Sequence, residues 1–170
     1  MLFDFIAFDA DDTLWHNETL YHATRDKFEQ IMAPYSAPEA TAEWLDRIEM
    51  RNLEPFGYGI KPFILSMVET AVEISAGQIP ANDIQKIVGI AHEMVDAEVE
   101  LLDGVRETVA RLAATYPLML VTKGDPLDQE RKLQKSGLGE YFRYIEIMWD
   151  KTREKYAALF TITRLNRSAF

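Results

Sequence analysis

The spacing of apolar residues changes twice along the chain. The residues from Leu2 to Phe8 form a short apolar run, broken by one acid, that turns polar at Asp9, which is typical of a buried strand. In residues 16–100 apolar positions recur at intervals of three and four, the period of an amphipathic helix. Strand and helix patterns alternate after residue 100. The pattern therefore predicts an α/β fold with a helical insertion after the first strand.

Four helices are predicted within the insertion, with breaks marked by Pro34 and Gly77. Their expected ranges are 19–32, a segment that starts at Pro38, 61–75 and 84–99. Four consecutive helices predict a compact bundle. The chain is expected to leave and re-enter the α/β unit near residues 15–18 and 99–103.

The rest of the chain predicts a parallel sheet with flanking helices. Helical patterns fall at 105–112, 127–136 and 152–160, and strand patterns at 117–121 and 144–148. We therefore expect an α/β core made of residues 1–15 and 101–170, interrupted by a helical cap of residues 16–100.

Composition narrows the function classes. The chain has 18 Lys and Arg against 28 Asp and Glu, a net charge of −10 that repels nucleic acid and anionic membranes. It contains no Cys, which excludes disulfides and thiolate metal sites. No segment approaches the ~20 apolar residues of a membrane span, and no signal-peptide pattern precedes the first strand. We expect a cytoplasmic protein with no nucleic-acid or membrane partner.

Three carboxylates, Asp9, Asp11 and Asp12, follow the first strand directly. Asp9 and Asp11 are two residues apart, so in an extended chain both side chains lean to the same side. Open parallel sheets bind ligands beyond the carboxyl ends of their strands, which is where this pair is expected. An isolated Asp-x-Asp is often only a turn or a helix cap, and Asp12 is best interpreted as a turn residue.

With its strand, this segment resembles the first motif of the haloacid dehalogenase superfamily of hydrolases, an apolar strand followed by Asp-x-Asp-x-Thr, here Asp9, Asp11 and Thr13. The second motif is a Ser or Thr that ends a later strand, matched by Thr122. The third is a downstream Lys, matched best by Lys151. The resemblance implies a Rossmann-like parallel sheet core with an inserted helical cap.

The resemblance also implies roles for these residues. Asp9 would attack phosphorus to form an aspartyl phosphate, and Asp11 would protonate the leaving oxygen and then activate water. Thr122 and Lys151 would bind the phosphate. The implied cofactor is Mg²⁺, held by the Asp9 carboxylate and the Asp11 backbone carbonyl, with water at its other positions.

Weaker candidates come from other segments. Lys132 and Lys155 are alternatives for the motif-three lysine. The segments that begin at Tyr58 and Thr122 look like those of a superfamily subgroup with a helical cap. The substrate-binding candidates are Thr13, Thr122, Lys123, Tyr58 and Lys61. Other aromatic residues at helical spacing are more typical of a core.

One feature departs from the superfamily pattern. The fourth motif, an acidic pair or Gly-Asp that supplies a further metal ligand, should follow residue 160, but residues 160–170 contain no Asp or Glu. This predicts weak Mg²⁺ affinity. It also predicts an unpaired apolar edge at the first strand, and so a possible homodimer.

Two functions of different classes follow. The first is a Mg²⁺-dependent phosphomonoesterase acting on a small phosphorylated metabolite, and the alternative is a catalytically weak or silent domain that serves as a binding or oligomerising module. A carbon–halogen hydrolase is less favoured, since the superfamily's dehalogenases do not need the second Asp as an acid.

Overall fold

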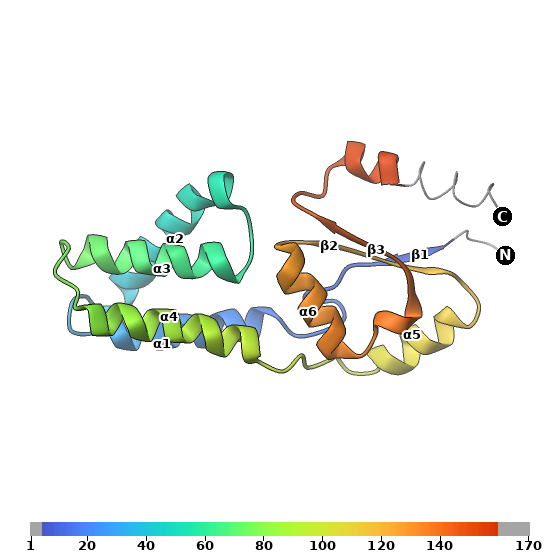
Figure 1. Ribbon diagram of the computed structural model, residues 1–170, viewed down its shortest axis with the longest axis horizontal. Coiled ribbons are helices and arrows are strands. Elements are labelled where there is room, and N and C mark those ends of the chain that lie inside the picture. Colours follow the sequence, from blue (N-terminus) through green and yellow to red (C-terminus); the bar gives the residue numbers. More distant parts are fainter. Residues whose placement is uncertain (1–4, 160–170) are drawn as a thin grey trace.

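The computed structural model describes residues 5–159, which form an α/β part and a helical part (Figure 1). The parallel sheet has the strand order β1 (Ile6–Phe8), β2 (Leu118–Lys123) and β3 (Phe142–Met148). Thr122 is the second-last residue of β2 and lies opposite Ile147 of β3. Because the strands run in the same direction, Asp9 and Thr122 emerge at one edge of the sheet.

Helices cover both faces of the sheet. They are α5 (Val105–Ala113), α6 (Pro126–Ser136), the 3₁₀ helix η1 (Gly139–Tyr141) and a helix at 153–159. Leu118 and Leu120 of β2 pack with α5 and α6. Met119 and Val121 pack on the other side with Leu159, and Figure 1 shows these helices on opposite sides of the sheet. A central strand buried on both faces is the usual arrangement in parallel sheets.

The helical part has its own core. Its helices are α1 (Glu18–Met32), α2 (Pro38–Phe56), α3 (Ile60–Ile74) and α4 (Ala81–Asp96). They pack around a cluster that includes Phe28, Leu45, Met67 and Ile87. Figure 1 shows the four helices grouped beside the α/β part. The predicted α/β class with a helical insertion after the first strand is confirmed.

Two adjacent chain segments join the parts. The amide of His16 donates to the carbonyl of Glu100 at 2.9 Å, and that of Leu102 donates to Leu14 at 3.0 Å. The predicted helix at 84–99 is α4, which begins and ends three residues earlier, and this pairing explains why it ends at Asp96. The backbone is already extended at Ala97, with ψ at 141°, so the residues that follow form the connection rather than another helical turn.

The predicted strand start at Leu2 and the predicted tail at 160–170 lie outside the described residues. Within residues 5–159, β1 pairs with β2 alone, so the expected free edge at β1 stays a prediction. No helix in the part of the chain that the structure describes is long and apolar enough to cross a membrane.

Candidate active site

A tight turn after β1 presents the two aspartates. Ala10 and Leu14 are buried, and the amide of Leu14 donates to the Ala10 carbonyl at 2.8 Å, which anchors the turn in the core. Asp12 adopts a φ of 55°, and its carboxylate accepts from the amides of Asn17 and Glu18 at 2.9 and 3.0 Å. Asp12 is thus confirmed as a turn residue, and it also caps the start of α1.

Asp9 lies next to the predicted motif-three lysine. Lys151 donates to Oδ1 of Asp9 at 2.5 Å, and the amide of Ala10 donates to the same oxygen at 2.8 Å. The Asp9 side chain is 49% exposed, whereas that of Lys151 is 22% exposed. One oxygen is therefore held by two donors, while the carboxylate as a whole stays open to solvent.

Asp11 is held far more completely. Lys132 donates to both of its oxygens, at 2.7 and 2.8 Å. The indole of Trp15 donates to Oδ1 at 2.7 Å, and the amide of Gln129 donates to Oδ2 at 2.8 Å. These four contacts match the acceptor capacity of an ionised carboxylate. The Asp11 side chain therefore has a fixed orientation.

Thr122 is linked to Asp11 through Gln129. The Thr122 hydroxyl, which is buried, donates to Oε1 of Gln129 at 3.3 Å, and the same amide group reaches Asp11 through its nitrogen. The strand end predicted as motif two thus lies beside motif one. A ligand that displaces Gln129 would find the Thr122 hydroxyl ready to donate.

Sequence reasoning missed the role of α6. The sequence offers Lys132 only as an alternative for the lysine beside the nucleophile, and its pattern does not single out Gln129. Both lie on one face of α6, three residues apart, together with the buried Asp128. Burial raises the pKa of Asp128, while Lys132 lowers it and Asp11 raises it. The available signal was the spacing of Asp128, Gln129 and Lys132, which places Lys132 one helical turn from the other two, beside the buried Leu133.

These side chains line a hollow of about 380 Å³ at the carboxyl edge of the sheet. Of the predicted residues, the lining includes Asp9, Asp11, Thr122, Lys151, Lys123 and Tyr58. The lining carries three lysines and five acidic side chains, Asp9, Asp11, Asp12, Glu18 and Asp128. An anionic ligand would therefore rely on lysines placed close to it, and on a bound cation, to offset these carboxylates. The hollow also takes residues from the helical part, since Tyr21 and Tyr58 line it.

The other predicted residues lie differently. Thr13 is exposed and is not part of the lining of this hollow. Lys61 pairs with Asp125 at 2.8 Å, and Lys123 lies 3.6 Å from the ring centroid of Tyr58. Burial raises the pKa of Asp125, but hydrogen bonds from Lys61 and from the backbone outweigh this effect and hold the pKa below its usual value. Both pairs connect the helical part with the end of β2.

The donor set for a metal ion is small. No group of three or more His, Cys, Asp or Glu side chains able to hold a metal occurs among residues 5–159. The Asp11 carboxylate is occupied by its donors, which leaves the Asp9 carboxylate and the Asp11 backbone carbonyl. Two oxygens fit a Mg²⁺ that keeps most of its water ligands.

The sequence matches the model of the haloacid dehalogenase-like hydrolases over residues 3–158, and the chain therefore belongs to this family. Members of this superfamily generally use Mg²⁺. The match spans both the α/β part and the helical part, so the family assignment rests on the whole described fold.

Solved structures support the same assignment. A haloacid dehalogenase-like family hydrolase from Xanthomonas campestris is 42% identical, with a TM-score of 0.87 over 93% of this chain and 66% of that one. A 2-haloacid dehalogenase from Pseudomonas syringae is 22% identical, with a TM-score of 0.57 over 86% of this chain and 64% of that one, and shows the shared fold alone. The chain thus spans slightly less than two thirds of either relative. No curated protein matches it.

Proposed function

We propose that the protein hydrolyses phosphomonoesters of small molecules through an aspartyl-phosphate intermediate. The observation that carries this proposal is the pairing of each aspartate with its own lysine at one sheet edge. Lys151 contacts Asp9, and Lys132 contacts Asp11, beside the hydroxyl of Thr122. Such a site combines a nucleophile, a proton carrier and phosphate-binding groups.

In the first step, Oδ2 of Asp9 attacks phosphorus, because Oδ1 is held by Lys151 and the Ala10 amide. The new bond joins Asp9 to phosphorus and the ester P–O bond breaks. Asp11, which takes up a proton from solvent once part of its donor set is released, gives that proton to the departing alcohol oxygen. In the second step, water attacks phosphorus and loses a proton to Asp11. The Asp9–phosphorus bond then breaks and inorganic phosphate leaves.

The remaining groups would bind the phosphoryl oxygens. Lys151 and Lys123 supply positive charge, and Thr122 supplies a hydroxyl donor. Bound at Asp9 and the Asp11 carbonyl, Mg²⁺ would offset the negative charge between the phosphate and Asp9. Lys132 and Gln129 would orient Asp11 and would not contact phosphate directly.

Residues 16–100 would form a cap over this site. Support comes from Tyr58, which lines the hollow and lies against Lys123, and from Lys61, which pairs with Asp125. We assign Tyr58 to substrate binding and Lys61 to holding the cap in place. Thr13 would act through the backbone of the turn, because its side chain is exposed.

Hydrolysis of a carbon–halogen bond is disfavoured by Asp11. A halide leaves without a proton, whereas an alcohol oxygen needs one, and Asp11 is held where it can supply it. The silent module is favoured by a different observation. At least one of the four hydrogen bonds to the Asp11 carboxylate must break before Asp11 can transfer a proton. A site in which all four persist would be inactive.

Hydrolysis of p-nitrophenyl phosphate tests the proposal. We expect turnover with Mg²⁺ that is lost with EDTA and in Asp9→Asn. If the wild-type protein does not exceed Asp9→Asn, the silent module is the better explanation. A melting-temperature shift with Mg²⁺ and beryllium fluoride then separates a folded, ligand-binding site from a closed one.

A further inference from the structure

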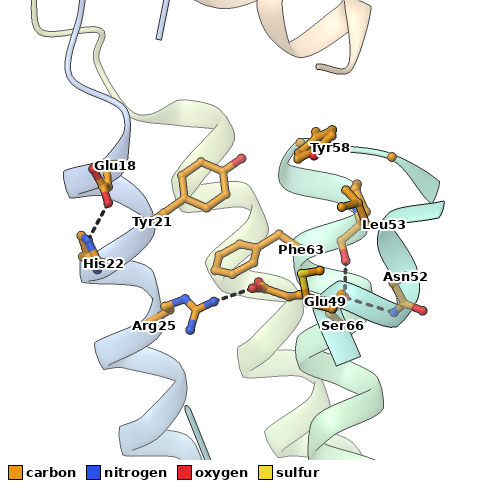
Figure 2. Close-up of a pocket in the computed structure, with 14 residues that line it drawn as sticks. Glu18, Tyr21, His22, Arg25, Glu49, Asn52, Leu53, Tyr58, Phe63 and Ser66 are labelled. Atoms are coloured by element: carbon orange, nitrogen blue, oxygen red, sulfur yellow. Dashed lines mark hydrogen bonds and ion pairs between the residues drawn. The ribbon is translucent and has the colours of Figure 1, made fainter. Parts of the chain in front are cut away.

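A second cavity, of about 400 Å³, lies in the helical part between α1, α2 and α3 (Figure 2). Glu18, Tyr21, Tyr58 and Gly59 line both this cavity and the hollow that contains Asp9. The two spaces therefore adjoin. The volume falls within the ~300–1,000 Å³ of small-molecule sites and exceeds the ~150 Å³ that holds a benzene ring.

The walls of this cavity are mainly apolar. The rings of Tyr21 and Phe63 lie with their centroids 4.8 Å apart and an interplanar angle of 44°. Figure 2 shows the ring of Tyr21, from α1, above that of Phe63, from α3, with Leu53 and Tyr58 across the cavity. Met50 completes the apolar surface. Aromatic walls of this kind favour a flat apolar group over a hydroxylated one.

The polar end of the cavity carries no free positive charge. Among the described residues that line it, Arg25 is the one Arg or Lys. Arg25 donates to Asp46 at 2.6 Å and also pairs with Glu49, so two carboxylates offset its charge. Figure 2 shows Arg25 directed at Glu49, below Phe63. Glu18, which pairs with His22 at 3.4 Å, also lines the cavity, so the carboxylates of the cavity outnumber the guanidinium of Arg25 and disfavour a second anionic group on a ligand.

Tyr21 stands where the two spaces meet. Burial raises the pKa of its phenol, and Asp128 and Asp11 raise it further, so the hydroxyl keeps its proton. The ring contributes to the apolar wall, while the hydroxyl end lies towards Tyr58 in Figure 2. Tyr21 can therefore donate a hydrogen bond to a ligand that passes from the hollow into the cavity.

We infer that this cavity binds the alcohol portion of the substrate, and that the substrate is a phosphomonoester of an aromatic or apolar alcohol with no second anionic group. The inference rests on the proposed phosphatase function and specifies its substrate class. The inference is supported by the juxtaposition of a hollow that holds the proposed phosphate-binding groups, Lys123, Lys151 and Thr122, with an apolar cavity whose one Arg or Lys among the described residues is paired with carboxylates.

Four phosphate esters of alkyl alcohols test the inference, because their leaving groups differ little in basicity. They are 2-phenylethyl phosphate, 2-(2-naphthyl)ethyl phosphate, the 4-carboxy derivative of the phenyl compound and glycerol 3-phosphate. We expect kcat/KM for the two esters whose aromatic portion carries no charge to exceed that for the other two by about tenfold or more. Equal values for all four esters would overturn the inference and leave the phosphatase proposal intact.

Two variants place the preference in the cavity. Leu53→Trp fills it, and we expect the preference for the naphthyl ester over glycerol 3-phosphate to fall by about tenfold. Leu65→Trp is the matched control, since Leu65 is on the outer face of α3 and 37% exposed. Met50→Trp serves if Leu53→Trp does not fold, because Met50 lines the cavity but is 70% exposed. A preference unchanged in both filling variants would refute the assignment.

A binding measurement separates the two proposals. Fluorescence titration of the Asp9→Asn protein with 2-(2-naphthyl)ethanol does not depend on turnover. Saturable binding that is weakened in the filling variants, with no hydrolysis of any ester by the wild type, would retain the cavity assignment and reject the phosphatase. Absence of such binding would reject the cavity assignment whatever the activity.

Discussion

Asp9 and Asp11 lie two residues apart but are held in different ways. Asp9 has one oxygen bound by two donors and is half exposed, as a nucleophile must be to meet its substrate. Asp11 is 24% exposed and contacts Lys132, Trp15 and Gln129. At the scale of single residues, the proposed mechanism therefore depends on Lys132 as much as on the motif residues.

Lys132→Met removes the ammonium group that contacts both oxygens of Asp11. Asp11 then keeps only two donors, and the ammonium group that lies between it and Asp128 is gone. We expect kcat for p-nitrophenyl phosphate to fall by about 100-fold, the scale of a lost acid–base contribution. The control is Lys155→Met, which changes an exposed lysine and should keep wild-type kcat. Wild-type activity in Lys132→Met would contradict the role of Lys132.

Tyr21 predicts a pH dependence of stability. Its pKa is raised from the ordinary 10.0 by burial first, so above about pH 10 the unfolded chain releases a proton that the folded protein keeps. The contribution is fully present below that pH and is lost as pH rises towards the folded value. We expect the melting temperature to fall more steeply between about pH 9 and 11 in the wild type than in Tyr21→Phe. Parallel curves would show that Tyr21 is not buried as described.

At the scale of elements, the sequence identified the ends of strands better than the faces of helices. Asp9 and Thr122 could be placed together because parallel strands end at one edge, whatever packs around them. Lys132 and Gln129 could not, because their contact with Asp11 depends on the rotation of α6 about its own axis. That rotation is fixed by buried side chains such as Leu133, packed against other parts of the chain.

The loop between α2 and α3 shows how an element boundary serves the site. Gly59 has φ 124° and ψ −179°, a region that essentially only glycine adopts, and a Cβ there would lie 3.2 Å from Cβ of Asp125. The glycine allows the cap to approach the end of β2 closely. The sequence marks the segment that begins at Tyr58 as similar to that of a superfamily subgroup. It does not predict that Gly59 contacts Asp125.

Gly59→Ala should therefore destabilise the fold. We expect the free energy of unfolding to fall by about 1–3 kcal/mol, from the strained backbone and the close contact. Gly89→Ala is the matched control, because Gly89 lies within α4 with nothing within 4 Å of its Cβ position, and should stabilise by about 0.5–1 kcal/mol. Urea unfolding with a shared slope measures both. A neutral Gly59→Ala would contradict the described loop geometry.

At the scale of the whole molecule, the two parts meet over the site. The cap contacts the α/β part through Lys61 and Asp125 and through Tyr58 and Lys123, beside the hollow. The sequence predicted the two units and their order, because periodicity is a local property. It did not predict the second cavity, since that depends on which sides of α1, α2 and α3 face one another.

A homodimer through the edge of β1 remains a proposal at this scale. Within residues 5–159, β1 has a neighbour on one side only, and Ala7 in its centre is exposed. We expect size-exclusion chromatography with light scattering to show a dimer that Ala7→Lys dissociates, because charge on an edge strand opposes pairing. Ala158→Lys, at an exposed position of the helix at 153–159, is the control. A wild-type monomer would count against the dimer.

The most direct measurement is to trap the phosphorylated enzyme. The protein is mixed with Mg²⁺ and p-nitrophenyl phosphate, quenched in acid, digested and examined by mass spectrometry. We predict one phosphoryl group on Asp9, sensitive to hydroxylamine and absent in Asp9→Asn. Turnover without this adduct, or a phosphoryl group on another residue, would contradict Asp9 as the nucleophile.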